Sequence, residues 1–420
     1  MPSTAQIAFL LILGAALLLL ATDRLRIELT ALLLILALAA SGVLTPLQAA
    51  SGFVSAATLI VVGVLVMSAA LAATGASARI ADWIGHHAGT SEWRSLLVIM
   101  PAVALLSAVS HHLMVTAMML PVLLDHARRT GIAASRLLMP MAFAASLGTT
   151  ITVFAAPSML LADTVLRQAG RPGLGVLSLA PVGVALTVLG LVFMQLARGL
   201  LPLRAGTTAA LPAPMHADAP PQRRRMLLAV VILGGSIAVA VALPHRAVVA
   251  FLGGAALMLL GGCLTPRAAA RAIDLRIVLL IAAAVPLGLA MDLTGTSTLA
   301  AGALDPLLSG WSPAWRLLAM FWAAALLTQI LSDAATTVLL APIALHLAGS
   351  LGPSPEAAVI CTAVGAVTGF LTPIGHHGSL LVLGPGGYRF TDYLRIGLPL
   401  TALCSIVTVA IAAWRWPLSG

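Results

Sequence analysis

The chain has 420 residues, of which 60% are hydrophobic and only 8% are charged, and this composition excludes a soluble multidomain protein. The net charge of +9 comes from 22 basic residues, all of them arginine, set against 13 acidic residues. Because these charges are scattered through short loops, we attribute them to membrane topology, predict an all-α polytopic membrane protein and expect no nucleic-acid partner.

The first half contains four continuous apolar segments and two interrupted ones. The continuous segments, which are about long enough to cross a bilayer, are residues 5–21, 29–44, 56–74 and 175–196. The first of them has no basic region before it, so we expect a retained span rather than a signal peptide.

The two interrupted segments of this half predict a hairpin and a broken helix. Two short apolar arms, residues 95–109 and 114–124, flank the polar tip Ser110–His111–His112 and predict a re-entrant hairpin. A further span, residues 135–165, is expected to break at its polar cluster, residues 148–152.

The second half repeats this pattern after a segment rich in proline, alanine and charge. Residues 198–225 are predicted to be a cytoplasmic linker between a first repeat, residues 1–197, and a second repeat, residues 226–420. The continuous spans of the second repeat are predicted at residues 226–243, 248–262, 277–293 and 394–414. Hairpin arms are expected at residues 315–331 and 335–347, and a broken span at residues 357–383.

An internal duplication relates the two halves. At an offset of 221 residues, aligned pairs include Thr116 with Thr337, Pro121 with Pro342, Gly131 with Gly352 and Gly148 with Gly369. Five crossings in each half would place the halves in opposite orientations, so we predict two inverted repeats, each with a re-entrant hairpin and a broken helix. The arginine distribution then places both termini outside the membrane.

Polar interruptions at corresponding places in two repeats are the sequence sign of broken helices that meet at a binding site. Helix N-termini at such breaks offer N–H donors to an anion, and unwound carbonyl groups offer oxygen to a cation. The predicted substrate-binding residues are His111, His112, Thr149, Thr150, Ser332, Thr372, Pro373, His376 and His377. The predicted ion-coupling residues are Ser110, Gly148, Thr152, Asp333, Thr336, Thr337, Gly369, Gly375 and Ser379.

Each kind of residue in these two sets also has a possible structural role. Asp333 could bind sodium, carry a proton, or cap the second arm of its hairpin. The histidine pairs could bind an anion, shuttle protons, ligate a metal or form local hydrogen bonds. Threonine hydroxyls commonly bond back to helix carbonyl groups, and the glycines could serve close helix packing.

Other polar features give no sign of catalysis. The three cysteines lack paired spacing and no nucleotide-binding or hydrolase motif is present, so we predict neither an enzyme nor a cofactor. His86 and His87 are expected in an interfacial loop without a role. Asp163 and Asp292 lie toward the ends of spans and are expected to be solvated.

Several short segments on either side of the predicted tips and breaks have a distinctive sequence. They are SRLLMP at residues 135–140, SLGTT at 146–150, LAPIA at 340–344, FLTPIGH at 370–376 and GPGGYRFTDY at 384–393. In these segments the chain resembles the divalent anion:sodium symporter family, and the resemblance covers nearly the whole chain. It implies a homodimer in the inner (plasma) membrane that moves dicarboxylates, citrate or sulfate with sodium by an elevator-type motion.

The chain departs from that family at both hairpin tips. Where the family carries Ser-Asn-Thr, this sequence has His111–His112–Leu113 and Ser332–Asp333–Ala334. Asp333 can still offer oxygen to sodium, but imidazole is a poorer sodium ligand, so both sodium and protons stay open as coupling ions.

These observations together predict a secondary active transporter of small anions, with di- or tricarboxylates as the first candidates and sulfate as the second. One alternative is an efflux or antiport carrier of the same superfamily, such as an arsenite or sodium/proton exchanger. The others are an intramembrane metalloenzyme built on the histidines and Asp333, and a passive channel.

Overall fold

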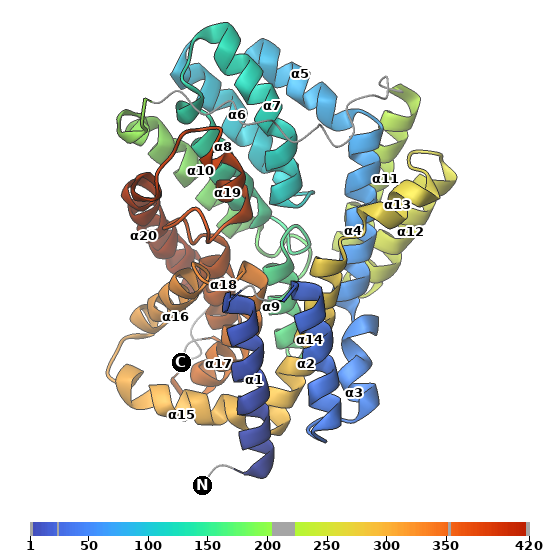
Figure 1. Ribbon diagram of the computed structural model, residues 1–420, viewed down its shortest axis with the longest axis vertical. Helices are drawn as coiled ribbons and strands as arrows, with labels where there is room; N and C mark the ends of the chain where they lie inside the picture. The colour runs from blue at the N-terminus through green and yellow to red at the C-terminus, as the bar shows by residue number, and fades with distance from the viewer. Residues whose placement is uncertain (1–2, 23–24, 204–222, 352–353, 417–420) are drawn as a thin grey trace.

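The computed structural model describes residues 3–22, 25–203, 223–351 and 354–416, and all regular elements in these ranges are helices (Figure 1). The all-α prediction is therefore confirmed. Most of the predicted linker, residues 204–222, lies outside the described residues.

The helices of the first half follow the predicted spans closely. They are α1 (Thr4–Thr22), α2 (Ile27–Ala40), α3 (Pro46–Ala50), α4 (Ala56–Ala73), α5 (Ala76–His87), α6 (Glu92–Ser107), α7 (His112–Thr130), α8 (Leu138–Thr149), α9 (Pro157–Gln168) and α10 (Ala180–Ala197). Short 3-10 turns, η1 (Ser51–Val54), η2 (Ala134–Arg136) and η3 (Arg198–Leu200), lie between them.

The second half has a matching series of helices. They are α11 (Arg223–Ala242), α12 (Ala247–Leu260), α13 (Pro266–Ala272), α14 (Leu275–Leu293), α15 (Thr296–Leu308), α16 (Pro313–Leu327), α17 (Asp333–Leu351), α18 (Pro355–Val367), α19 (His377–Leu383) and α20 (Phe390–Arg415), with η4 (Pro244–Arg246) before α12. Five stretches are long and apolar enough to cross a membrane by length and composition, namely Pro46–Ala73, Ala180–Leu200, Arg223–Ala242, Leu275–Leu293 and Phe390–Arg415.

The duplication seen in the sequence persists in the helix boundaries. Helices α7 and α17 are related by 221 residues at both ends, since 333 − 112 and 351 − 130 both equal 221. Figure 1 places the α6–α7 hairpin at the upper end of the molecule and α15 and α17 in the lower part. The inverted orientation of the repeats and their sidedness in the membrane stay predictions.

Two helices were not predicted, and one prediction about them is wrong. His86 and His87 belong to α5 rather than to a loop. Both α5 and its counterpart α15 follow a glycine in the left-handed conformation, Gly75 with φ 85° and Gly295 with φ 70°, which ends the preceding span and starts a new helix.

The two halves interlock rather than lying side by side. Helix α4 packs against α11 and α12, while α14 packs against α2, so the third long helix of each half lies against early helices of the other. Gly63 permits the first of these contacts, because a Cβ atom there would lie 2.8 Å from the backbone carbonyl carbon of Phe251.

The helix breaks are exchanged between the halves in the same way. Helix α9, which follows the first break and starts with Pro157, packs against α17 and α18. Helix α19, which follows the second break, packs against α7 and α8. Each break therefore lies beside the hairpin of the other half.

Candidate functional site

Asp333 lies where the N-terminus of α17 meets the N-terminus of α9. The hydroxyl of Ser158, the second residue of α9, donates a hydrogen bond of 3.2 Å to Oδ2 of Asp333. Ser332 caps α17, because its Oγ accepts from the backbone N–H of Ala335 at 3.2 Å. The Asp333 carboxylate is therefore directed to the other half of the molecule and does not serve as the cap.

The duplication places a second serine opposite a different side chain. Since 158 + 221 is 379 and 333 − 221 is 112, the counterparts of Ser158 and Asp333 are Ser379 and His112, on the contacting helices α19 and α7. His112 is 1% exposed, and its ring centroid lies 4.1 Å from that of His376 and 4.2 Å from that of His111. The two predicted histidine pairs thus meet.

Three buried hydroxyl groups near these helix starts have no hydrogen-bond partner among the described residues. They belong to Thr116, Thr336 and Ser379. A Cβ atom on Gly378 would lie 3.0 Å from Thr116 Oγ1 and 3.3 Å from His376 Nδ1, so two polar groups face the start of α19. Buried donors without partners are costly, and a bound ligand would satisfy them.

Four of the predicted threonines use their hydroxyl protons within the protein. Thr149 donates to the carbonyl of Ser146, Thr150 to that of Leu147, Thr152 to that of Ala108 and Thr337 to that of Asp333, at 2.6–2.8 Å. Thr152 thereby joins the first break to the tip of its own hairpin. For a ligand these four oxygens remain as acceptors only.

Gln329, a residue that was not predicted, joins the second break to the second hairpin tip. Its Nε2 donates to the carbonyl of Gly369 at 2.9 Å, and its Oε1 accepts from both the N–H and the hydroxyl of Thr372, each at 2.9 Å. The Thr372 oxygen also accepts from the N–H of Gly375 at 3.2 Å. The buried Pro373 follows directly in this loop.

The paired glycines at the breaks allow close helix packing. A Cβ atom on Gly148 would collide with the backbone of Ala104, and one on Gly369 would lie 3.0 Å from the carbonyl oxygen of Ala325. Ala104 and Ala325 are themselves related by 221 residues, so the same contact occurs in both halves.

The remaining predicted residues lie at the tip and break of the first site. Ser110 is buried, with 7% exposure, in the first hairpin tip. His111 precedes α7, and its Nδ1 accepts from the N–H of Leu113 at 3.3 Å. His377 begins α19, and its side chain lies outside the described residues.

Two further expectations concern metal binding and the acidic residues at span ends. Among the described residues, no group of three or more His, Cys, Asp or Glu side chains is arranged to hold a metal ion. Asp163 is buried, and its carboxylate accepts from the N–H of Leu174 and from Arg167. The prediction that Asp163 is solvated is therefore wrong.

Symmetry could have revealed two of the residues that sequence reasoning missed. Ser158 is the counterpart of Ser379, and Thr116 is the counterpart of Thr337, and both of these counterparts were predicted. Gln329 gave a weaker signal, as one amide in the sequence LLTQILSD.

Comparison with known sequences identifies the type of protein. Residues 17–365 match the model of a family described as citrate transporter. An uncharacterized transporter of Synechocystis is 43% identical over 152 residues, which are 36% of this chain and 25% of that protein. Sodium/sulfate cotransporter 1 of Chlamydomonas reinhardtii is 30% identical over 162 residues, 38% of this chain and 18% of that protein. The matched segments thus span a quarter or less of these relatives.

Two solved structures share the fold. The YdaH transporter of Alcanivorax borkumensis aligns with a TM-score of 0.60 over 88% of both chains at 17% identity. MtrF of Neisseria gonorrhoeae, described among antimetabolite efflux pumps, aligns with a TM-score of 0.64 over 88% of this chain and 83% of its own at 16% identity. At this level of identity the likeness concerns the fold.

Proposed function

The chain belongs to the citrate transporter family, and on that premise we propose that it is a secondary active transporter of small anions, not an enzyme. Di- or tricarboxylates are the first candidate substrates and sulfate is the second, since one relative is a sodium/sulfate cotransporter. The coupling ion is sodium or a proton, and no cofactor takes part. The protein acts as a homodimer in the inner (plasma) membrane, by an elevator-type motion.

The meeting of helix starts with buried, unpartnered hydroxyls is the observation that carries this proposal. The N-termini of α7, α9 and α17 hold partial positive charge and free N–H groups, which favour an anion. The hydroxyls of Thr116 and Ser379 add donors beside the imidazoles of His112 and His376. A carboxylate or sulfate group of the substrate would accept hydrogen bonds from these groups.

Asp333 supplies the reason for coupling. An ionised carboxylate near a bound anion repels it, and burial makes this repulsion stronger than in water. Sodium held by Asp333 and Ser158, or a proton on Asp333, removes the repulsion. The anion and the cation therefore favour each other's binding, and this linkage is what a symporter requires.

Uptake of labelled succinate, citrate and sulfate into proteoliposomes tests the proposal, with sodium and pH gradients imposed separately. We expect gradient-driven uptake of at least one anion, lost in Asp333→Asn and retained in Asp125→Asn. Asp125 is the matched control because its carboxylate is exposed and pairs with Arg129 on the surface of α7. No uptake of any of the three anions above that of empty liposomes would overturn the proposal. Reversed gradients distinguish import from export or exchange.

A further inference from the structure

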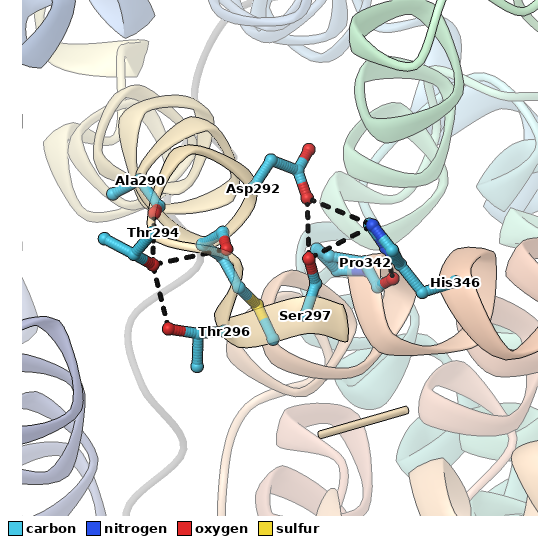
Figure 2. A network of polar contacts seen from close by, with 8 residues as sticks. Ala290, Asp292, Thr294, Thr296, Ser297, Pro342 and His346 are labelled. Carbon is cyan, nitrogen blue, oxygen red and sulfur yellow. Dashed lines mark hydrogen bonds and ion pairs between the residues drawn. The ribbon is translucent and has the colours of Figure 1, made fainter. Parts of the chain in front are cut away.

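A polar cluster outside the candidate site joins three helices of the second half. Asp292 lies near the end of α14, Ser297 near the start of α15 and His346 in α17, and Figure 2 shows their side chains directed toward one another. Ser297 Oγ donates to Asp292 Oδ1 at 3.0 Å and lies 3.2 Å from His346 Nε2. His346 Nδ1 lies 3.0 Å from the carbonyl oxygen of Pro342.

The number of protons on the imidazole decides how many of these contacts exist at once. A carbonyl oxygen only accepts, so Nδ1 of His346 carries a proton. If Nε2 is unprotonated, the single hydroxyl proton of Ser297 can serve either Asp292 or His346, but not both. If Nε2 is protonated, it donates to Ser297, Ser297 donates to Asp292, and the positive ring lies 3.9 Å from the carboxylate.

This geometry does not suit a serine nucleophile. In a catalytic triad the carboxylate holds Nδ1 of the histidine while Nε2 takes the serine proton. Here Nδ1 bonds to a backbone carbonyl, and Asp292 and Ser297 both lie on the Nε2 side of His346. What the cluster can do is bind a proton.

No other charged group described here competes for His346. The elements packed against α17 are α9, α14, α15, α16 and α18. Their other charged side chains contact groups elsewhere: Asp163 with Arg167, Glu28 with Arg276, Arg171 with Glu356, and Arg316 with the carbonyls of Leu308 and Ser309. Asp305 lies two turns beyond Ser297 on α15.

We propose that Asp292, Ser297 and His346 form a proton-binding site, separate from the transport site, that ties α17 to the corner between α14 and α15. The protonated ring completes the chain of contacts, and its loss of a proton breaks one of them. Helix α17 begins with Asp333, so the tie holds the far part of the helix that carries that residue. The aligned positions of the first half hold Ala72 and Asp125, so the tie acts on one hairpin alone.

A double-mutant cycle tests whether the contact depends on a proton. The melting temperatures of the wild type, Asp292→Asn, His346→Gln and the double variant are measured by tryptophan fluorescence at about pH 5.5 and about pH 8, on either side of the usual titration of histidine. Because the two side chains are 39% and 30% exposed and therefore screened, we expect a coupling of about 1–3 °C at the acid pH. At the alkaline pH the coupling should fall below half of that value.

His87→Gln is the matched control, because Nδ1 of His87 makes the same contact, at 2.8 Å, with the carbonyl four residues earlier. Its effect should add to that of Asp292→Asn at both pH values. If the effects at positions 292 and 346 are additive at both pH values, or coupled equally at both, the proposal is wrong.

The melting experiment requires no transport, so it stands or fails independently of the proposed function. Where transport is observed, His346→Gln should raise the uptake rate about 2–5-fold at the acid pH and leave it unchanged at the alkaline pH. Uptake that is unchanged or slower at the acid pH would contradict the tie while leaving the transport function intact.

Discussion

Gln329 offers the sharpest test of how the second break is held at the second hairpin tip. Its amide makes four hydrogen bonds, to the carbonyls of Ala325 and Gly369 and from the two donors of Thr372, at 2.7–2.9 Å. In Gln329→Ala these partners lose their bonds, and the Gly369 carbonyl and the Thr372 N–H are left in a partly buried loop. Each unsatisfied buried group costs about 1–3 kcal/mol. Because water can replace part of the loss at this half-buried residue, we expect a total of about 2–4 kcal/mol.

The assay is thermal unfolding of the detergent-solubilised protein, followed by tryptophan fluorescence with and without a saturating anion. Gln329→Ala should melt several degrees below the wild type, and it should also bind the anion more weakly because the break loop is no longer fixed. Gln329→Glu should be no better, since it places a carboxylate oxygen against the carbonyls of Ala325 and Gly369. The matched control is Gln195→Ala, which loses one bond of 2.9 Å to the carbonyl of Trp93.

The reasoning about Gln329 would be refuted by a variant that melts with the wild type. The same holds if Gln329→Ala and Gln195→Ala lose equal stability, because the argument depends on four bonds in one case and one in the other. A loss of stability with unchanged anion affinity would show that the staple supports the fold but does not shape the site.

Three further substitutions separate binding from packing. Ser379→Ala should weaken anion binding about 10-fold in a calorimetric titration without lowering the melting temperature, because it removes a buried donor that has no partner among the described residues. Gly148→Ala should cost about 3 kcal/mol or more and reduce the yield of monodisperse protein, because its Cβ meets the backbone of Ala104. Tyr388→Phe should cost about 2–4 kcal/mol in thermal unfolding and leave anion affinity unchanged, because the hydroxyl bonds two buried backbone groups that precede or begin α8.

The positions of the long helices could be predicted because they depend on local sequence. An apolar run ended by glycine or proline has one stable solution in a membrane, and Pro157 starts a helix where the missing N–H costs nothing. Helices α5 and α15 escaped prediction because they are short and polar enough to resemble loops. Their signal was a glycine, Gly75 or Gly295, in the left-handed conformation after each span.

The contents of the site could be predicted only in part, since the pairing of the elements depends on tertiary packing. Sequence spacing placed Ser158 near its own hairpin, whereas the structure places it against Asp333 of the other half. The stacking of His112 on His376 likewise joins segments more than 260 residues apart. No periodicity in either segment carries that information.

The chemical difference between two duplicated positions suggests how the site is divided. Duplication gave each half a serine after its break and a facing residue at the start of a hairpin helix. In one pair the facing residue is Asp333, which when ionised only accepts hydrogen bonds, and in the other it is His112, which can also donate. A ligand that satisfies both pairs must present positive charge or a proton to Asp333 and negative charge to His112 and Ser379. An anion that travels with a cation meets this condition, whereas an anion alone leaves Asp333 uncompensated.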